Sequence, residues 1–204
     1  MARLKVRGFE IHKGFLAAEA QRELIQALRP VLRAAPLFSP GVPGGGQMSV
    51  RMTSAGTYGW FSDKSGYRYA DRHPSGQAWP EIPAEVLKIW TALIDRDRMP
   101  DCCLFNYYGE GARMGLHQDK DESPASIAAG MPVVSISIGD TARFLFGGVR
   151  RRDPVDTIPL ASGDGFVFGG AARLRYHGVS RIMPATAPPE LGIAGRYNLT
   201  FRQY

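Results

Sequence analysis

Three residues of this chain have the types and the spacing of a metal site. His117 and Asp119 are two positions apart, so on an extended segment their side chains would point to the same face. A second histidine, His177, lies far along the chain. Two histidines and one carboxylate form the facial triad of non-haem iron(II) oxygenases, which leaves coordination positions open. Zinc would more often be held by further His or Cys ligands in a closed tetrahedron.

The spacing alone is a weak signal. The chain has 4 histidines and 19 acidic residues in 204 positions, so some His-x-acid pair arises by chance with a probability of about 0.4. The alternative interpretation is that His117 and Asp119 hydrogen-bond to each other in a surface turn. Features elsewhere in the chain must decide between the two.

The last predicted strand supplies such a feature. Apolar and polar residues alternate strictly in it, so one face would carry Tyr197, Leu199 and Phe201 and the other Arg196, Asn198, Thr200 and Arg202. A half-buried strand with one solvated face would show the same alternation. In a closed barrel, however, one face points inward, and two inward arginines need anionic partners.

The separation of Arg196 and Arg202 suits a small diacid. Six residues of strand span ~20 Å, and each side chain reaches back roughly 6 Å toward the middle. The remaining gap is about the length of a five-carbon dicarboxylate. The planar arginine fork binds both oxygens of a carboxylate. A metal with open positions beside such a slot is what a keto-diacid cosubstrate needs.

Two helices and a series of short strands are expected to position these residues. The helices are predicted at 14–29, where apolar residues recur every four positions, and at 83–98. Pro30 should stop or kink the first helix, and residues 36–47 should form a loop. Strands are predicted at 102–108, 133–138, 143–146, 157–160, 165–168, 173–179 and 196–203. Helices first and short strands after predict a mainly β (α+β) fold, an antiparallel double-stranded β-helix or jelly-roll barrel with N-terminal helices.

The composition fits one soluble domain over residues 1–204, because 44% of the residues are hydrophobic and 22% are charged. The formal net charge of +6 suits a polyanionic partner, although charge alone does not establish one. Adjacent Cys102 and Cys103 do not suit a disulfide, so we expect a reducing, cytoplasmic location. We find no signal peptide and no run of ~20 apolar residues, and we expect no membrane partner and a monomer.

Several longer segments share their order and spacing with one known family. They are residues 48–53, 59–60, 66–67, 106–108, 116–122, 176–178 and 196–202. Together, from about residue 45 to 204, they resemble the AlkB family of iron(II)- and 2-oxoglutarate-dependent nucleic-acid dealkylating dioxygenases. The resemblance implies oxidative demethylation of bases such as 1-methyladenine and 3-methylcytosine in DNA or RNA. Fe(II), 2-oxoglutarate and O2 would be used, and succinate, CO2 and formaldehyde released.

The resemblance also implies roles for individual residues. The iron ligands at the catalytic centre would be His117, Asp119 and His177. Arg196 would hold the far carboxylate of 2-oxoglutarate and Arg202 would act nearer the metal. The cosubstrate site would be completed by Asn106, Tyr108 and Asn198.

The substrate base would lie between Trp60 and the ring of His117, with Asp121 at its edge and Tyr67 at the backbone phosphate. A methyl group on the pairing edge is hidden in a duplex, so the base must be flipped out or single-stranded. A cationic base gains cation–π attraction from Trp60, and Asp121 adds a negative charge. Uncharged lesions should therefore be poorer substrates.

Residues 45–80 would form a nucleotide-recognition lid over a catalytic core at 101–204. Charged and aromatic residues interleave from Arg51 to Trp79, which suits contact with a strand. The alternative is a solvated hairpin with some core aromatics. Met52 would line the base pocket or fill the core. Arg151, within a cluster of three arginines at 150–152, would clamp a phosphate or lie in an exposed turn.

The chain departs from the family pattern at a few places. Phe168 stands where relatives carry tryptophan, residues 123–132 form a slightly long loop, and little before residue 45 can be matched. We expect His12 and His73 at the surface, and Asp164 as a simple hairpin-turn residue.

Two other functions compete. One is an iron(II)- and 2-oxoglutarate-dependent hydroxylase acting on a protein side chain or small molecule, which would need no stacking segment at 60–67 and no Asp121. The other is a module that binds damaged nucleic acid without turnover, which the complete metal and cosubstrate set argues against.

Overall fold

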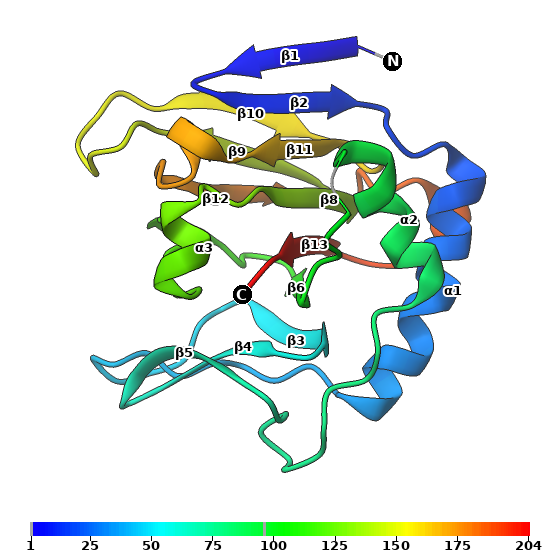
Figure 1. Cartoon of the computed structure of the whole chain (residues 1–204). Coiled ribbons are helices and arrows are strands. Elements are labelled where there is room, and N and C mark those ends of the chain that lie inside the picture. The colour runs from blue at the N-terminus through cyan, green and yellow to red at the C-terminus, as the bar shows by residue number, and fades with distance from the viewer. Residues whose placement is uncertain (1, 96) are drawn as a thin grey trace.

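Two antiparallel sheets face each other in the computed structural model, which describes residues 2–95 and 97–204 (Figure 1). The larger sheet has the strand order β1-β2-β11-β8-β13-β6-β3 and the smaller one β10-β9-β12-β7. The larger sheet consists of β1 (Ala2–Val6), β2 (Phe9–Lys13), β11 (Gly165–Phe168), β8 (Val133–Gly139), β13 (Arg196–Arg202), β6 (Cys102–Tyr108) and β3 (Arg51–Gly56). The smaller sheet consists of β10 (Asp156–Leu160), β9 (Thr141–Phe146), β12 (His177–Met183) and β7 (Met114–His117). The predicted jelly-roll architecture is confirmed.

The alternation in β13 separates the two cores of the molecule. Leu199 and Phe201 face the helices on the outer side of the larger sheet, in one buried apolar cluster. The polar face of β13 points between the two sheets, and Phe144 and Phe166 belong to the second cluster there. The strand pairs with β6 and β8 throughout its length, so the backbone groups on both of its sides are hydrogen-bonded. Polar residues at the centre of the barrel are therefore held in a fixed register.

Helices α1 (Ala18–Ala34) and α2 (Ala84–Leu93) cover the outer face of the larger sheet (Figure 1). Both predicted ends of α1 were wrong. The helix begins at Ala18 and not at 14, and it continues past Pro30 to Ala34. The ring of Pro30 lies on the exposed side of α1, where the carbonyl that loses its partner can be solvated, while Leu28 and Val31 remain buried. The second helix is shorter than predicted. No helix in the described residues is long and apolar enough to cross a membrane.

The expectation of helices first and strands after is also wrong, since five strands precede residue 101. β1 and β2 form a hairpin whose two-residue turn, Arg7 and Gly8, has φ values of 48° and 82°. Both values are positive, which is the turn geometry that tight hairpins favour. β4 (Gly59–Asp63) and β5 (Gly66–Ala70) form a separate two-stranded hairpin below the two sheets in Figure 1.

The segments that enter and leave the site differ from the predicted strands. β12 begins at His177 and not at 173, because a 3-10 turn (η1, Gly170–Ala172) precedes it and the side chain of Arg173 is buried. The long loop at 123–132 contains a short helix, α3 (Pro124–Ala128), which the hydroxyl of Ser123 caps. A second 3-10 turn, η2 (Pro189–Leu191), precedes β13.

Candidate functional site

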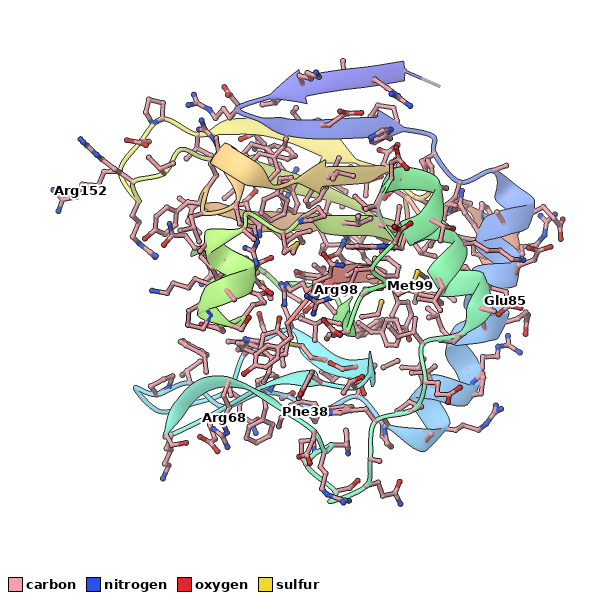
Figure 2. The ribbon with its side chains drawn as sticks, in the orientation of Figure 1. Phe38, Arg68, Glu85, Arg98, Met99 and Arg152 are labelled. Carbon is pink, nitrogen blue, oxygen red and sulfur yellow. The ribbon has the colours of Figure 1, made fainter. Side chains whose placement is uncertain are left out.

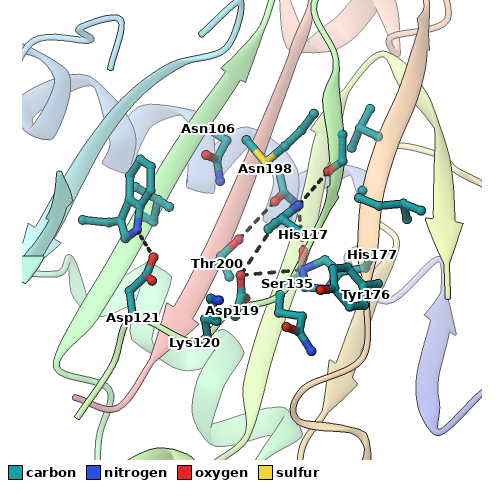
Figure 3. A pocket seen from close by; sticks show the side chains of 18 of the residues that line it. Asn106, His117, Asp119, Lys120, Asp121, Ser135, Tyr176, His177, Asn198 and Thr200 are labelled. Atoms are coloured by element: carbon teal, nitrogen blue, oxygen red, sulfur yellow. Dashed lines mark hydrogen bonds and ion pairs between the residues drawn. The ribbon is translucent and has the colours of Figure 1, made fainter. Parts of the chain in front are cut away.

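Strand pairing places His117 and His177 directly opposite each other. They are register partners between β7 and β12, and their ring centroids are 4.4 Å apart. Asp119 lies two residues beyond the end of β7, and its Oδ1 is 3.7 Å from Nε2 of each histidine (Figure 3). One ligand atom from each of the three residues lies within 4.8 Å of the others. The structure therefore brings together the three residues that the spacing selected.

The two imidazole rings are oriented by backbone carbonyls. Nδ1 of His117 is 2.9 Å from the oxygen of Gly115, and Nδ1 of His177 is 3.1 Å from the oxygen of Arg175. An Nδ1–H that donates to a carbonyl leaves the Nε2 lone pair available as a metal ligand. Burial, together with His117, lowers the pKa of His177 to about 4. The ring of His177 is thus neutral and able to bind metal well below pH 7.

Asp119 is buried yet remains a carboxylate. Burial acts to raise its pKa, but the charge of Arg202, helped by the two histidines, holds the pKa well below its usual range. Nη2 of Arg202 is 2.8 Å from Oδ2 of Asp119, which leaves Oδ1 facing the histidines. Two imidazole nitrogens and one carboxylate oxygen on one side of a cavity are the donors that non-haem iron(II) accepts. The residues present fit iron(II).

Glu122 is a site residue that sequence reasoning missed. Its side chain is 1% exposed and lies between Arg173 Nη2, at 2.8 Å, and Arg202 Nε, at 3.2 Å. The hydroxyl of Tyr69 in β5 donates to Oε1 of Glu122 at 2.9 Å. Arg173 also donates to the backbone oxygen of Asp119. A buried acid between two buried arginines joins the Asp119 loop, the segment before His177 and the β4–β5 hairpin.

A cavity of about 430 Å³ lies between the two sheets beside these groups. Its polar wall comes from β6, β8 and β13 and includes Asn106, Tyr108, Ser135, Asn198, Thr200 and Arg202. Asn198 donates to the hydroxyl of Ser135 at 2.7 Å and accepts from Thr200 at 3.1 Å (Figure 3). The buried Oδ1 of Asn106 has no hydrogen-bond partner among the described residues. The wall thus offers polar groups to a small ligand bound next to the metal site.

Arg196 is fully buried beside this cavity, although its side chain is not part of the lining. Nη1 donates to the carbonyl oxygens of Asp140 and Leu160, at 3.2 and 3.0 Å, and Nη2 donates to the hydroxyl of Ser137. Nε has no partner among the described residues. Burial lowers the pKa of Arg196 to about 10, so the group remains charged at neutral pH. Within the described residues no carboxylate forms an ion pair with this guanidinium, although the charges of Asp164 and Asp140 act on it, so a place remains for an anionic ligand.

The expected substrate residues line the same cavity. The indole N–H of Trp60 donates to Oδ2 of Asp121 at 2.8 Å (Figure 3). The ring of Tyr67 is stacked on Trp60, with centroids 5.6 Å apart and planes 19° apart. Met52 is both buried in the core and part of the cavity lining, so the two roles weighed for it coincide.

The three arginines at 150–152 differ in whether their side chains line the cavity. Arg151 lies on the rim of the cavity, where Nη1 donates to the oxygen of Leu116 at 2.8 Å and the guanidinium lies over the ring of Tyr176. Arg150 and Arg152 are exposed, and Arg152 projects from the end of its loop in Figure 2.

Two predictions about other polar residues were wrong, and a third holds only in part. His12 and His73 are buried, not at the surface. Both rings find polar partners, since His12 lies 3.2 Å from Glu10 and His73 contacts Ser75 and the oxygen of Pro36. Asp164 does lie in a turn, but it is 2% exposed and accepts hydrogen bonds from two backbone N–H groups.

Phe168, the residue that departs from the family pattern, is buried and lines the cavity. Its ring packs edge-on against His177, with the two centroids 5.1 Å apart. The cavity wall at this position is therefore aromatic and apolar, and it contacts one of the candidate metal ligands directly.

Comparison with known proteins gives a consistent result. Residues 8–202 match the 2OG-Fe(II) oxygenase superfamily, whose description names iron(II) and 2-oxoglutarate. An alpha-ketoglutarate-dependent dioxygenase AlkB homolog of Caulobacter vibrioides (strain NA1000 / CB15N) is 48% identical over 97% of this chain and 88% of its own. DNA N(6)-methyladenine demethylase ALKBH1D of Arabidopsis thaliana is 34% identical over 97% of this chain and 49% of its own. The solved structure of OsALKBH1 superposes with a TM-score of 0.83 at 35% identity and covers 100% of both chains.

The match to the superfamily spans almost the whole chain, and the Caulobacter vibrioides relative is covered over most of its length. All strands of the two facing sheets except β1, together with the paired histidines and the cationic polar wall, lie within the matched region. The chain therefore belongs to the 2OG-Fe(II) oxygenase superfamily and, within it, to the AlkB family of alpha-ketoglutarate-dependent dioxygenases.

Proposed function

We propose that this enzyme removes N-alkyl groups from bases of DNA by oxidation. The observation that carries the proposal is the position of Trp60, whose indole donates to Asp121 in the lining of the same cavity as His117, Asp119 and His177. A flat aromatic surface and a carboxylate over a metal site suit a cationic nucleobase. The cavity volume falls within the ~300–1000 Å³ that small-ligand sites occupy.

The polar wall would hold 2-oxoglutarate. Arg196 would bind the far carboxylate through the partner-free Nε–H and an Nη2–H, which lie on the same edge of the guanidinium plane. Arg202 would act nearer the metal, where it already fixes Asp119. Asn106, Tyr108 and Asn198 complete the wall, and the free Oδ1 of Asn106 shows that one polar group there still lacks a partner among the described residues.

The apolar side of the cavity would protect the reaction from water. Phe144, Phe166 and Phe168 line that side, and Phe144 and Phe168 also pack against His177. Excluding water suits an oxidation whose reactive species must meet the substrate and not solvent. When bound, iron(II) with 2-oxoglutarate and O2 supplies the oxidising power, and the protein supplies position and exclusion.

The reaction balances without any further reagent. One oxygen atom of O2 enters succinate as CO2 leaves 2-oxoglutarate, and the other enters a C–H bond of the N-methyl group. The hydroxymethylated base then breaks its N–C bond and releases formaldehyde. From a cationic base the hydroxyl proton passes to solvent and the base becomes neutral; from a neutral base that proton passes to the nitrogen. No described side chain needs to act as a nucleophile.

The β4–β5 hairpin would act as the nucleotide-recognition lid over the core. A base flipped from a duplex, or one in a single strand, would enter between Trp60 and the ring of His117. Tyr67, half-exposed on β5, and Arg151, whose Nη1 donates to the oxygen of Leu116, would contact the flanking phosphates. The chemistry of this entrance accepts RNA as well as DNA, and we propose that the enzyme acts as a monomer.

The direct test uses single-stranded oligonucleotides, each carrying one 1-methyladenine, 3-methylcytosine or N6-methyladenine. The protein is loaded with Fe(II) and 2-oxoglutarate, and the mass of each oligonucleotide and the succinate formed are measured after exposure to O2. We expect loss of the methyl group with equal amounts of succinate, and faster reaction of the two cationic bases. Succinate formation stimulated by a metabolite or peptide, with no change in any oligonucleotide, would instead indicate the hydroxylase function.

A further inference from the structure

A partly buried cluster adjoins the segments whose oxygens accept hydrogen bonds from Arg196. A tight turn at residues 161–164 joins β10 to β11, and the segment from Lys13 to Gln21 packs across it. We call Lys13, Gln21, Ser162 and Asp164 the bracket. These residues lie outside the cavity lining, and all four come from segments to which the proposed function assigns no role.

Asp164 joins the segment at Lys13 and Gly14 to its own turn in the bracket. Its Oδ1 accepts from the backbone N–H of Gly14 at 2.8 Å, and its Oδ2 accepts from the N–H of Ala161 at 2.7 Å and from Lys13. Nζ of Lys13 also donates to the carbonyl oxygen of Pro159 at 3.0 Å. Such charge-assisted bonds in a buried place are among the stronger protein hydrogen bonds.

Ser162 makes the second connection. Its hydroxyl accepts from the N–H of Gly139 at 2.9 Å and donates to Oε1 of Gln21 at 2.6 Å. The intervening Gly163 has a φ of 81°, and a Cβ there would lie 2.6 Å from the oxygen of Leu16. Only glycine fits this close approach. The bracket is thus tightly packed against the turn.

The bracket reaches Arg196 through two of its three acceptors. The backbone of Ser137 pairs with the turn, since its N–H donates to the oxygen of Asp164 at 2.9 Å and its oxygen accepts from Gly163 at 2.8 Å. Leu160 directly precedes the turn. The hydroxyl of Ser137 and the carbonyl of Leu160 are bonded to Nη2 and Nη1 of Arg196.

We infer that the bracket fixes the guanidinium of Arg196 so that its Nε edge is presented to the far carboxylate of the cosubstrate, and thereby sets the affinity and the selectivity for a five-carbon 2-oxo diacid. The inference rests on the proposed role of Arg196. Arginine has many rotamers, and a binding group that is already held in place loses less freedom when the ligand binds. Ser162, Asp164, Lys13 and Gln21 are positioning residues in this account, because none of them touches the cosubstrate.

The test measures binding and not turnover. Calorimetry under anaerobic conditions, with the Fe(II)-loaded protein, gives the Kd of 2-oxoglutarate and of 2-oxopentanoate, which has the same carbon chain but ends in a methyl group. The variant is Ser162→Ala. The matched control is Ser180→Ala, which removes an exposed hydroxyl bonded to Arg143 on the outer side of β12. The reference is Arg196→Lys, which keeps the charge but loses the planar guanidinium that can bind both oxygens of a carboxylate.

We expect Ser162→Ala to weaken 2-oxoglutarate binding about tenfold, to leave 2-oxopentanoate binding within about twofold, and to have no further effect in an Arg196→Lys background. Ser180→Ala should change neither Kd. If Arg196→Lys weakens 2-oxoglutarate binding and Ser162→Ala does not, the bracket has no positioning role, although the role of Arg196 stands. If Arg196→Lys also binds normally, the proposed role of Arg196 is itself wrong.

A second variant tests the inference independently in case Ser162→Ala does not fold. Lys13→Met keeps the aliphatic stem but removes the ammonium group from Asp164, and the Lys13 side chain is 30% exposed, so the fold should tolerate it. Its 2-oxoglutarate Kd should rise about threefold or more, since one of the charged contacts to Asp164 is lost. Unchanged 2-oxoglutarate binding in this variant would overturn the inference.

Discussion

The hydroxyl group of Tyr69 donates a 2.9 Å hydrogen bond to Oε1 of Glu122. Tyr69 belongs to the β4–β5 hairpin, and Glu122 lies three residues beyond Asp119. Arg202 contacts all three side chains: Nε and Nη2 contact Asp119, Nε also contacts Glu122, and Nη1 donates to Tyr69 at 3.1 Å. The hairpin and the candidate metal site are therefore joined by one buried polar network.

This network predicts a large stability cost for Glu122→Gln. The change removes a buried charge between Arg173 and Arg202 and leaves both guanidinium groups less well compensated. We expect the free energy of unfolding to fall by about 3 kcal/mol, measured by urea denaturation of the metal-free protein. The control is Glu19→Gln, whose exposed ion pair with Arg22 should contribute less than about 1 kcal/mol. Equal losses in both variants would contradict the assignment.

The low pKa of His177 predicts how the stability of the metal-free protein depends on pH. Its ordinary pKa is 6.5 and burial lowers it to about 4 in the folded chain. Between these values the unfolded chain binds a proton that the folded chain does not, so stability is present above pH 6.5 and is lost as the pH falls toward 4. This residue contributes up to about 3 kcal/mol of that loss. The variant His177→Gln should show a shallower fall over the same range, and an unchanged slope would argue against a neutral, buried ring.

Asp121 should favour cationic substrates by its charge. Asp121→Asn keeps an oxygen that can accept the Trp60 indole hydrogen bond but removes the negative charge. We expect kcat/KM for 1-methyladenine to fall about tenfold, while the value for the neutral base N6-methyladenine stays within about twofold. Competition assays with both bases in oligonucleotides of the same sequence measure the ratio directly. A parallel fall for the two bases would mean that Asp121 acts only by holding Trp60.

Arg150 and Arg152 should contact phosphates without shaping the cavity. Replacing both with alanine should weaken binding of single-stranded DNA and reduce the slope of log K against log salt by about 1.4, because each phosphate contact contributes ~0.7. The control is the double change of Arg29 and Arg33 to alanine, which removes the same charge from the exposed side of α1. A similar loss of slope in the control would indicate a general effect of net charge, not a clamp at residues 150–152.

The sequence predicted the elements whose patterns are strong. The bounds of β6 and β11 agree with the prediction, and the inward polar face of β13 is as its alternation required. The continuation of α1 past Pro30 was missed because burial of Leu28 and Val31 offsets one lost hydrogen bond on an exposed face. β1 and β2 were not predicted, although charged and apolar residues alternate from Met1 to Glu10 and Gly8 is a residue typical of a tight turn.

Within the candidate site, only the residues whose side chains could bind a metal or an anionic ligand were predictable from the sequence. Histidine and carboxylate spacing selected His117, Asp119 and His177, and inward charge selected Arg196 and Arg202. Glu122 and Arg173 carry no such signal, because buried ion pairs depend on contacts between segments far apart in sequence. The same holds for His12 and His73, whose partners could not be read from their neighbours. Asp164 also looked like an ordinary turn residue until its contacts with Lys13 and Gly14 were known.

The most direct test of the account is a diffraction experiment on crystals grown without oxygen, with Fe(II) and 2-oxoglutarate, at a wavelength where iron scatters anomalously. We predict one iron peak bonded to Nε2 of His117, Nε2 of His177 and Oδ1 of Asp119, with the diacid running from the metal toward Arg196. His117→Ala, at a position only partly buried, should keep the fold and lose the peak. An iron peak away from these atoms, or a diacid that does not reach Arg196, would contradict the account.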